Sequence, residues 1–104
     1  MVEFIYDADC PNVEAARGQL RRAFERVGAS PEWQEWDREK DDAPAYARAY
    51  GSPTVLVGGR DVAGVQPSAD AACCRVYKRK DGSLKGVPSV DEIVAALSRS
   101  STDA

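Results

Sequence analysis

The sequence predicts an α/β domain with the element order β-α-β-α-β-β-α, and three observations lead to this class. Two short runs rich in β-forming residues, Val2–Tyr6 and Thr54–Val57, are typical of strands. Between them lies a segment with apolar residues at steps of three and four, which predicts a helix. The Gly58-Gly59 pair after the second run indicates a hairpin. Strands joined through a helix run parallel and a hairpin pairs antiparallel, so we expect a four-stranded mixed sheet with helices on both faces.

The first strand leads through a polar loop into the first helix. We expect this helix to begin at about Pro11, because proline is favoured at the first helical position. Gly28 is suited to end the helix in a left-handed conformation. The helix has one apolar stripe, which consists of Val13, Ala16, Leu20, Ala23, Phe24 and Val27.

An edge strand and a short helix follow. Residues 32–36 are extended but alternate poorly, which suits an edge strand, and residues 37–42 form a solvated loop. A short helix is expected to begin at Pro44 and to end at Gly51. The inner face of that helix consists of Tyr46, Ala47 and Tyr50.

The last third of the chain contains the remaining strand and the last helix. Residues 60–62 or, alternatively, residues 74–78 supply the strand that pairs with Thr54–Val57. Asp81-Gly82 predicts a turn, with the basic run 78–80 at a hairpin tip.

A capping box marks the start of the last helix. Ser89 is followed three residues later by Glu92, the spacing at which each side chain can bond the other residue's backbone N–H. The buried stripe of this helix consists of Ile93, Val94 and Leu97. We expect residues 1–98 to form the domain and residues 99–104 to form a flexible tail.

Composition narrows the classes of function. The chain has 104 residues, of which 43% are apolar and 30% charged, and a formal net charge of −3. This length predicts a single domain, and the acidic balance argues against a nucleic-acid partner. The absence of histidine excludes serine-histidine and cysteine-histidine catalysis and every zinc site that needs an imidazole. Neither a signal peptide nor a bilayer-spanning run is visible, so we expect a cytoplasmic protein without a membrane partner. We also expect the protein to be a monomer or a weak dimer.

Two motifs carry a resemblance to a known family. A strand runs into residues 10–13 (Cys-Pro-Asn-Val) at a helix start, and a short helix is followed by residues 51–54 (Gly-Ser-Pro-Thr) and a strand. In this order the motifs resemble the thioredoxin and glutaredoxin superfamily, over about residues 2–97, and imply a thioredoxin-like fold. More narrowly, the chain looks like small bacterial thioredoxin-like proteins of unassigned activity that also contain Cys-Arg-Val-Tyr, here residues 74–77.

The resemblance implies that Cys10 is the catalytic nucleophile of a glutaredoxin-like thiol–disulfide oxidoreductase. A thiolate at a helix N-terminus faces unpaired N–H groups and the positive end of the helix dipole, whereas Asp7 and Asp9 oppose a negative charge there. Val13 occupies the position of the family's second cysteine. The second sulfur would then come from glutathione as a co-substrate, or from Cys74 as a resolving thiol.

The resemblance also implies a substrate groove. Pro53 would be a cis-proline facing Cys10. The peptide at Ser52 would pair with the backbone of a substrate, which is a protein or small-molecule thiol or disulfide. Pro11, next to the nucleophile, would line the same groove.

Two further classes of function stay open. The adjacent Cys73 and Cys74 are poor disulfide partners for each other but good soft-metal ligands. Together with Cys10 they would form a three-thiol site for mercury, copper(I) or zinc without turnover, unless one of them is a buried apolar residue. The chain could also serve as a structural or interaction scaffold, because a fold does not determine a function.

The position of Cys74 separates these classes. If the Gly58-Gly59 hairpin is tight, residues 63–74 would return beside the active helix and Cys74 would reach Cys10. A disulfide between the two requires their α-carbons to lie within about 7 Å of each other.

Overall fold

The computed structural model describes residues 1–68 and 75–102, with side chains through residue 99. Four strands form the main sheet: β1 (Val2–Tyr6), β2 (Gln34–Asp37), β3 (Thr54–Val57) and β4 (Arg60–Asp61). Their order is β2-β1-β3-β4; β1 and β2 are parallel, and the β1–β3 and β3–β4 pairs are antiparallel. The predicted four-stranded mixed sheet is therefore confirmed, and β4 lies in the first of the two segments considered for its last strand.

The two central strands carry apolar side chains on both faces of the sheet. Phe4 and Val55 pair across β1 and β3 and belong to one core cluster, whereas Ile5 and Leu56 belong to a second cluster on the opposite face. A strand covered on both faces needs a continuous apolar run rather than an alternating one. This explains why the strongest strand signals in the sequence became the centre of the sheet.

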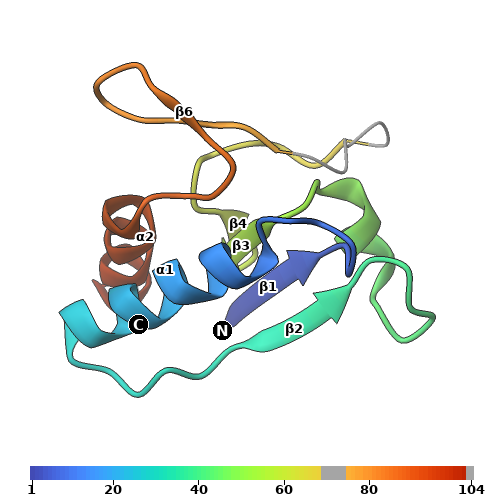
Figure 1. Ribbon diagram of the computed structural model, residues 1–104. Helices are drawn as coiled ribbons and strands as arrows, with labels where there is room; N and C mark the ends of the chain where they lie inside the picture. Colours follow the sequence, from blue (N-terminus) through green and yellow to red (C-terminus); the bar gives the residue numbers. More distant parts are fainter. Residues whose placement is uncertain (69–74, 103–104) are drawn as a thin grey trace.

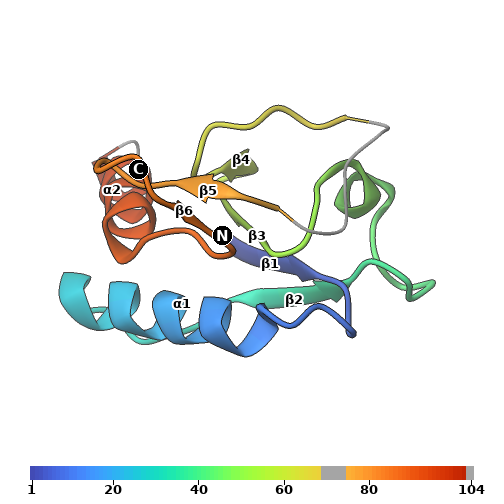
Figure 2. The same ribbon diagram turned by 45° about the horizontal axis from the view of Figure 1, so that its top comes forward.

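Two α-helices cover one face and a 3-10 helix covers the other. α1 (Val13–Val27) and α2 (Val90–Thr102) pack side by side, as Figures 1 and 2 show, and both contribute to the larger core cluster. On the opposite face, η1 (Ala45–Ala49) contributes Ala47 to the smaller cluster. Helices therefore cover both faces of the sheet, as expected, but the second face is covered by one short 3-10 helix.

Helix α1 begins two residues later than expected. Pro11 and Asn12 form a turn, and the first helical hydrogen bond joins the N–H of Ala16 to the carbonyl of Asn12 at 3.0 Å. Gly28 ends the helix with a φ of 72°, as expected for a left-handed C-terminal residue. The predicted apolar stripe is buried except for Val27, which is 39% exposed at the last turn.

The short helix after Pro44 has 3-10 geometry, which changes its inner face. With three residues per turn, residues three apart lie above one another. Ala47 and Tyr50 are accordingly buried, whereas Tyr46 is 46% exposed and does not belong to the inner face that the sequence predicted. The Tyr46 hydroxyl instead donates a hydrogen bond to the buried carboxylate of Glu3.

The segment before α2 forms a separate two-stranded ribbon. β5 (Tyr77–Lys78) pairs antiparallel with β6 (Leu84–Lys85), and Gly82 takes a φ of 88° in the predicted turn between them. Tyr77 at the start of the ribbon is buried and its hydroxyl bonds the carbonyl of Pro53, so this end packs on the domain, whereas Figure 1 shows the turn of the ribbon extending away from it. Residues 77–78 therefore belong to this ribbon rather than to the main sheet.

The capping box of α2 forms as predicted. The N–H of Ser89 donates to Oε1 of Glu92 at 3.0 Å, and the N–H of Glu92 donates to Oγ of Ser89 at 3.0 Å. The helix then continues to Thr102, past residue 98 at which the sequence analysis ends the domain.

Candidate functional site

Cys10 lies in the turn between β1 and α1. Its N–H donates to the carbonyl of Asp7 at 2.9 Å, and its own carbonyl accepts a longer bond from the N–H of Val13 at 3.4 Å. The side chain is half-buried and packs against the larger core cluster, near which Val87 also packs. Cys10 is a free, partly exposed cysteine, and its backbone is hydrogen-bonded on both sides.

Asp7 connects the Cys10 turn to the segment before β3. Its backbone N–H donates to Oγ of Ser52 at 2.9 Å, while its carbonyl accepts from Cys10. The carboxylate of Asp7 is buried and accepts a hydrogen bond from Nη1 of Arg38 at 2.9 Å. Asp7 was expected to oppose a thiolate at Cys10, but in the structure its carboxylate pairs with the Arg38 guanidinium.

Ser52 and Pro53, the predicted groove residues, lie inside the protein. The peptide bond between them is cis, as the sequence predicted, and neither side chain is exposed to solvent. The carbonyl of Ser52 accepts from the N–H of Arg75 at 2.9 Å, and the carbonyl of Pro53 accepts from the hydroxyl of Tyr77. The described chain from Arg75 onward therefore covers the peptide that was expected to face a substrate. Pro11, the third predicted groove residue, is exposed to solvent.

The segment that begins at Arg75 also contributes to a buried ion pair, which was not predicted from the sequence. Nη1 and Nη2 of Arg75 contact the two carboxylate oxygens of Asp61 at 2.6 and 3.1 Å, and the two side chains are 9% and 0% exposed. Nη1 of Arg75 also donates to Oγ1 of Thr54 at 3.0 Å, and the guanidinium lies 4.4 Å from the ring centre of Tyr77. The only sequence signal was that each charged residue stands next to valine, in Asp61-Val62 and Arg75-Val76.

The ion pair affects the ionisation of its members. Burial alone would lower the pKa of Arg75, but the hydrogen bonds and the charge of Asp61 outweigh burial and hold that pKa above its ordinary value. Burial raises the pKa of the Tyr77 phenol, and the positive charge of Arg75 only partly counteracts this rise. Arg75 therefore stays charged and Tyr77 stays protonated at neutral pH.

The predicted resolving and metal-binding cysteines fall largely outside the described residues. Cys73 and Cys74 both belong to residues 69–74, so the distances from either sulfur to Cys10 lie outside the description. Among the described residues, no group of three or more cysteine, aspartate or glutamate side chains converges on a point that could hold a metal ion.

The segment after β4 takes a different course from the one expected. Residues 63–74 were expected to return beside the active helix. In the described part, the N–H of Ser68 donates to the carbonyl of Ala49 at 2.7 Å, which places Ser68 at η1 rather than at α1. The described chain resumes at Arg75, bonded to Ser52.

The fold and the site together define a small α/β domain with a partly buried cysteine in the turn between its first strand and its first helix. No protein-family model, curated protein or solved structure matches the chain. Within residues 1–68 and 75–102, every helix is too short or too polar to cross a lipid bilayer.

Proposed function

We propose that the chain is a thioredoxin-like thiol–disulfide exchange protein with Cys10 as its nucleophile. The observation that carries this proposal is the hydrogen-bonded connection through Asp7, which links the backbone of the partly exposed Cys10 to Ser52, just before β3. Thiol–disulfide exchange requires an accessible thiol and a defined place for its partner. The sheet order β2-β1-β3-β4 with one parallel pair supports a thioredoxin-like arrangement, to which this chain adds the β5–β6 ribbon.

The proposed reaction consists of two exchange steps. The thiolate of Cys10 attacks one sulfur of a substrate disulfide, the substrate S–S bond breaks, and the leaving sulfur takes up a proton. The mixed disulfide is then attacked by a second thiolate, from glutathione or from Cys74, which releases the substrate sulfur as a thiol. Arg75, the residue after Cys74, is bonded to Ser52, and Ser52 is bonded to Asp7. This chain of contacts favours Cys74 as the internal resolving thiol.

The test is the reaction of the reduced protein with oxidised glutathione, followed by intact-mass and peptide mass spectrometry. We expect a Cys10–Cys74 disulfide in the wild type and a stable glutathione adduct at Cys10 in Cys74→Ser. Cys73→Ser is the matched control and should behave as the wild type. Iodoacetamide should also alkylate Cys10 faster than it alkylates free cysteine at the same pH.

Two results would overturn the proposal. If Cys10 neither forms a mixed disulfide nor reacts faster than free cysteine, the nucleophile assignment is wrong. If Cys74→Ser and Cys73→Ser behave alike, Cys74 is not the resolving thiol.

A further inference from the structure

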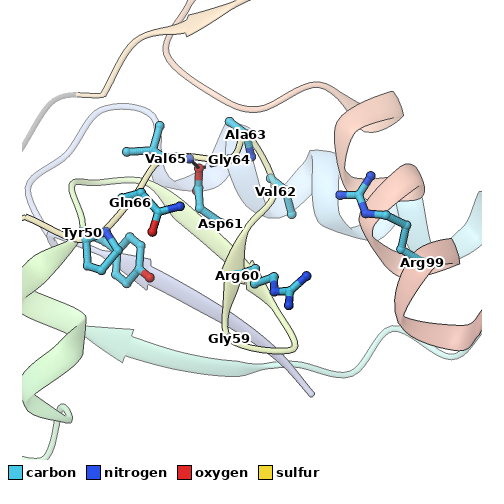
Figure 3. A pocket seen from close by; sticks show the side chains of 11 residues that line it. Tyr50, Gly59, Arg60, Asp61, Val62, Ala63, Gly64, Val65, Gln66 and Arg99 are labelled. Carbon is cyan, nitrogen blue, oxygen red and sulfur yellow. Dashed lines mark hydrogen bonds between the residues drawn. The ribbon is translucent and has the colours of Figure 1, made fainter. Parts of the chain in front are cut away.

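A hollow at the β4 edge of the sheet is separate from the cysteine site. It has a volume of about 470 Å³ and lies between the loop after β4, the end of η1 and the last turns of α2. This volume falls within the range of small-molecule sites. Figure 3 shows Arg60 and Arg99 on two sides of the hollow, with their side chains extending toward each other.

The two arginines bring uncompensated positive charge to the hollow. Arg60 belongs to β4 and Arg99 to α2, and within the described residues neither makes an ion pair or a side-chain hydrogen bond. Two guanidinium groups at one hollow repel each other unless an anion lies between them. A planar guanidinium presents several N–H donors and no acceptor.

Tyr50 adds a third donor on the floor of the hollow. This residue is 7% exposed, and its hydroxyl makes no hydrogen bond to any other described residue. Figure 3 shows the hydroxyl directed toward the side on which Arg60 lies. Burial, followed by the charges of Asp61 and Glu3, raises the pKa of this phenol, so that it remains a proton donor at neutral pH.

Among the described residues that line the hollow, only Asp61 carries a carboxylate, and both of its oxygens already accept hydrogen bonds. Both oxygens of Asp61 accept from Arg75, and Oδ2 also accepts from the N–H groups of Ala63 and Val65. The described lining therefore offers two guanidinium groups, a phenol and the amide of Gln66 as donors, and no free carboxylate. Such a site is complementary to a ligand with several acceptor oxygens and a negative charge.

We propose that this hollow binds the phosphate group of a phosphorylated small molecule. A phosphate monoester has three terminal oxygens, so two guanidinium groups and a phenol can each bond it, whereas one guanidinium already occupies both oxygens of a carboxylate. Val62 and Val65 line the same hollow and provide an apolar wall for the organic part of the ester. This site does not depend on thiol chemistry at Cys10.

Phenyl phosphate is the probe, and its binding to the full chain is measured by calorimetry and by amide shifts in NMR spectra. We expect saturable binding that weakens with added salt and survives in Cys10→Ser. Arg60→Gln and Arg99→Gln should each weaken binding by about tenfold or more, because each removes charge-assisted hydrogen bonds. Tyr50→Phe should weaken binding without changing its salt dependence, because it removes a donor but no charge.

Arg21→Gln is the matched control, since Arg21 is an exposed arginine on α1 outside the hollow. Its binding should equal that of the wild type, and circular dichroism should show that all variants are folded. Inorganic phosphate and phenol separate the contributions of the anion and of the ring, and both should bind more weakly than phenyl phosphate.

Three results would overturn the proposal. These are the absence of saturable binding, equal losses in Arg21→Gln and Arg60→Gln, and equal affinity for phenol and phenyl phosphate. If inorganic phosphate binds as tightly as phenyl phosphate, the apolar wall takes no part and the assignment to a phosphate ester is wrong.

Discussion

At the scale of single residues, the Arg75–Asp61 pair ties three parts of the chain together. Asp61 ends β4, and Arg75 leads into the β5–β6 ribbon and bonds the peptide before β3. A buried ion pair contributes little net stability compared with a well-packed apolar pair, because both charges lose their hydration. Removing only one of the two partners, however, destabilises the protein, because it leaves the other charge buried without a counter-charge.

Asp61→Asn is therefore expected to destabilise the protein strongly. The change leaves the charge of Arg75 buried beside a neutral amide, which costs about 3–5 kcal/mol in comparable cases. That is a large part of the ~5–15 kcal/mol by which domains of this kind are stable. The measurement is the free energy of unfolding in urea.

The comparison variant is Asp91→Asn, which removes the partner of Arg26. Those two side chains are 67% and 57% exposed, so solvent replaces the lost contact and the free energy of unfolding should change far less. Equal losses in the two variants would show that the Arg75–Asp61 pair is not desolvated as described.

At the scale of elements, the capping box makes the start of α2 dependent on one side chain. Ser89→Ala removes the acceptor of the Glu92 N–H and is expected to lower the free energy of unfolding by ~1 kcal/mol. Ser30→Ala changes an exposed serine between α1 and β2 and should leave stability unchanged. Urea unfolding of the two variants side by side checks this; a loss confined to Ser30→Ala would contradict it.

Local signals predicted most elements, and contacts between distant segments account for the rest. Proline, glycine and serine at element ends act on neighbouring residues, so the Gly58-Gly59 hairpin and the Ser89 cap were visible in the sequence. η1 packs through Ala47 on the face of the sheet that carries Ile5 and Leu56, a contact between distant segments that no local pattern encodes. The Arg75–Asp61 pair likewise joins residues far apart in the chain and has no periodic signature.

The same difference between local signals and distant contacts explains why only part of the candidate site was predicted. The place of Cys10 after the first strand and the Ser52-Pro53 peptide before β3 followed from element order. That Arg75 would bond the Ser52 carbonyl, and that Arg38 would pair with Asp7, depended on tertiary contacts. The sequence therefore predicted the cis peptide and the place of Cys10 after the first strand, but not that Ser52 and Pro53 would be buried.

At the scale of the whole molecule, three phenols with raised pKa values couple stability to alkaline pH. The pKa of Tyr77 and of Tyr50 is raised chiefly by burial, and that of Tyr46 chiefly by its hydrogen bond to Glu3, all from an ordinary value of 10.0. In the unfolded chain these phenols release their protons first. Their contribution to stability is therefore complete below pH 10 and is lost as the pH rises through the higher folded-state values.

Tyr50→Phe isolates one of these contributions. The free energy of unfolding should fall between about pH 9 and about pH 11 in both proteins, but less steeply in the variant. Lysine side chains titrate in both proteins, so the difference between the two urea-unfolding series reports Tyr50. Parallel pH dependences would contradict the assigned shift.

The central position of β1 in the sheet determines how late during synthesis the core can form. This strand leaves the ribosome before the other elements of the sheet, yet its antiparallel partner begins at Thr54, and α2, which completes the larger core cluster on the same face as α1, begins at Val90. The contact between Gln19 and Pro88 spans 69 residues. Pairings of such long range form slowly, because the chain loses loop entropy before they stabilise it. During synthesis the part of the α1 stripe that packs against α2 therefore stays uncovered until α2 has emerged, and a nascent chain halted before Val90 would be a substrate for chaperones.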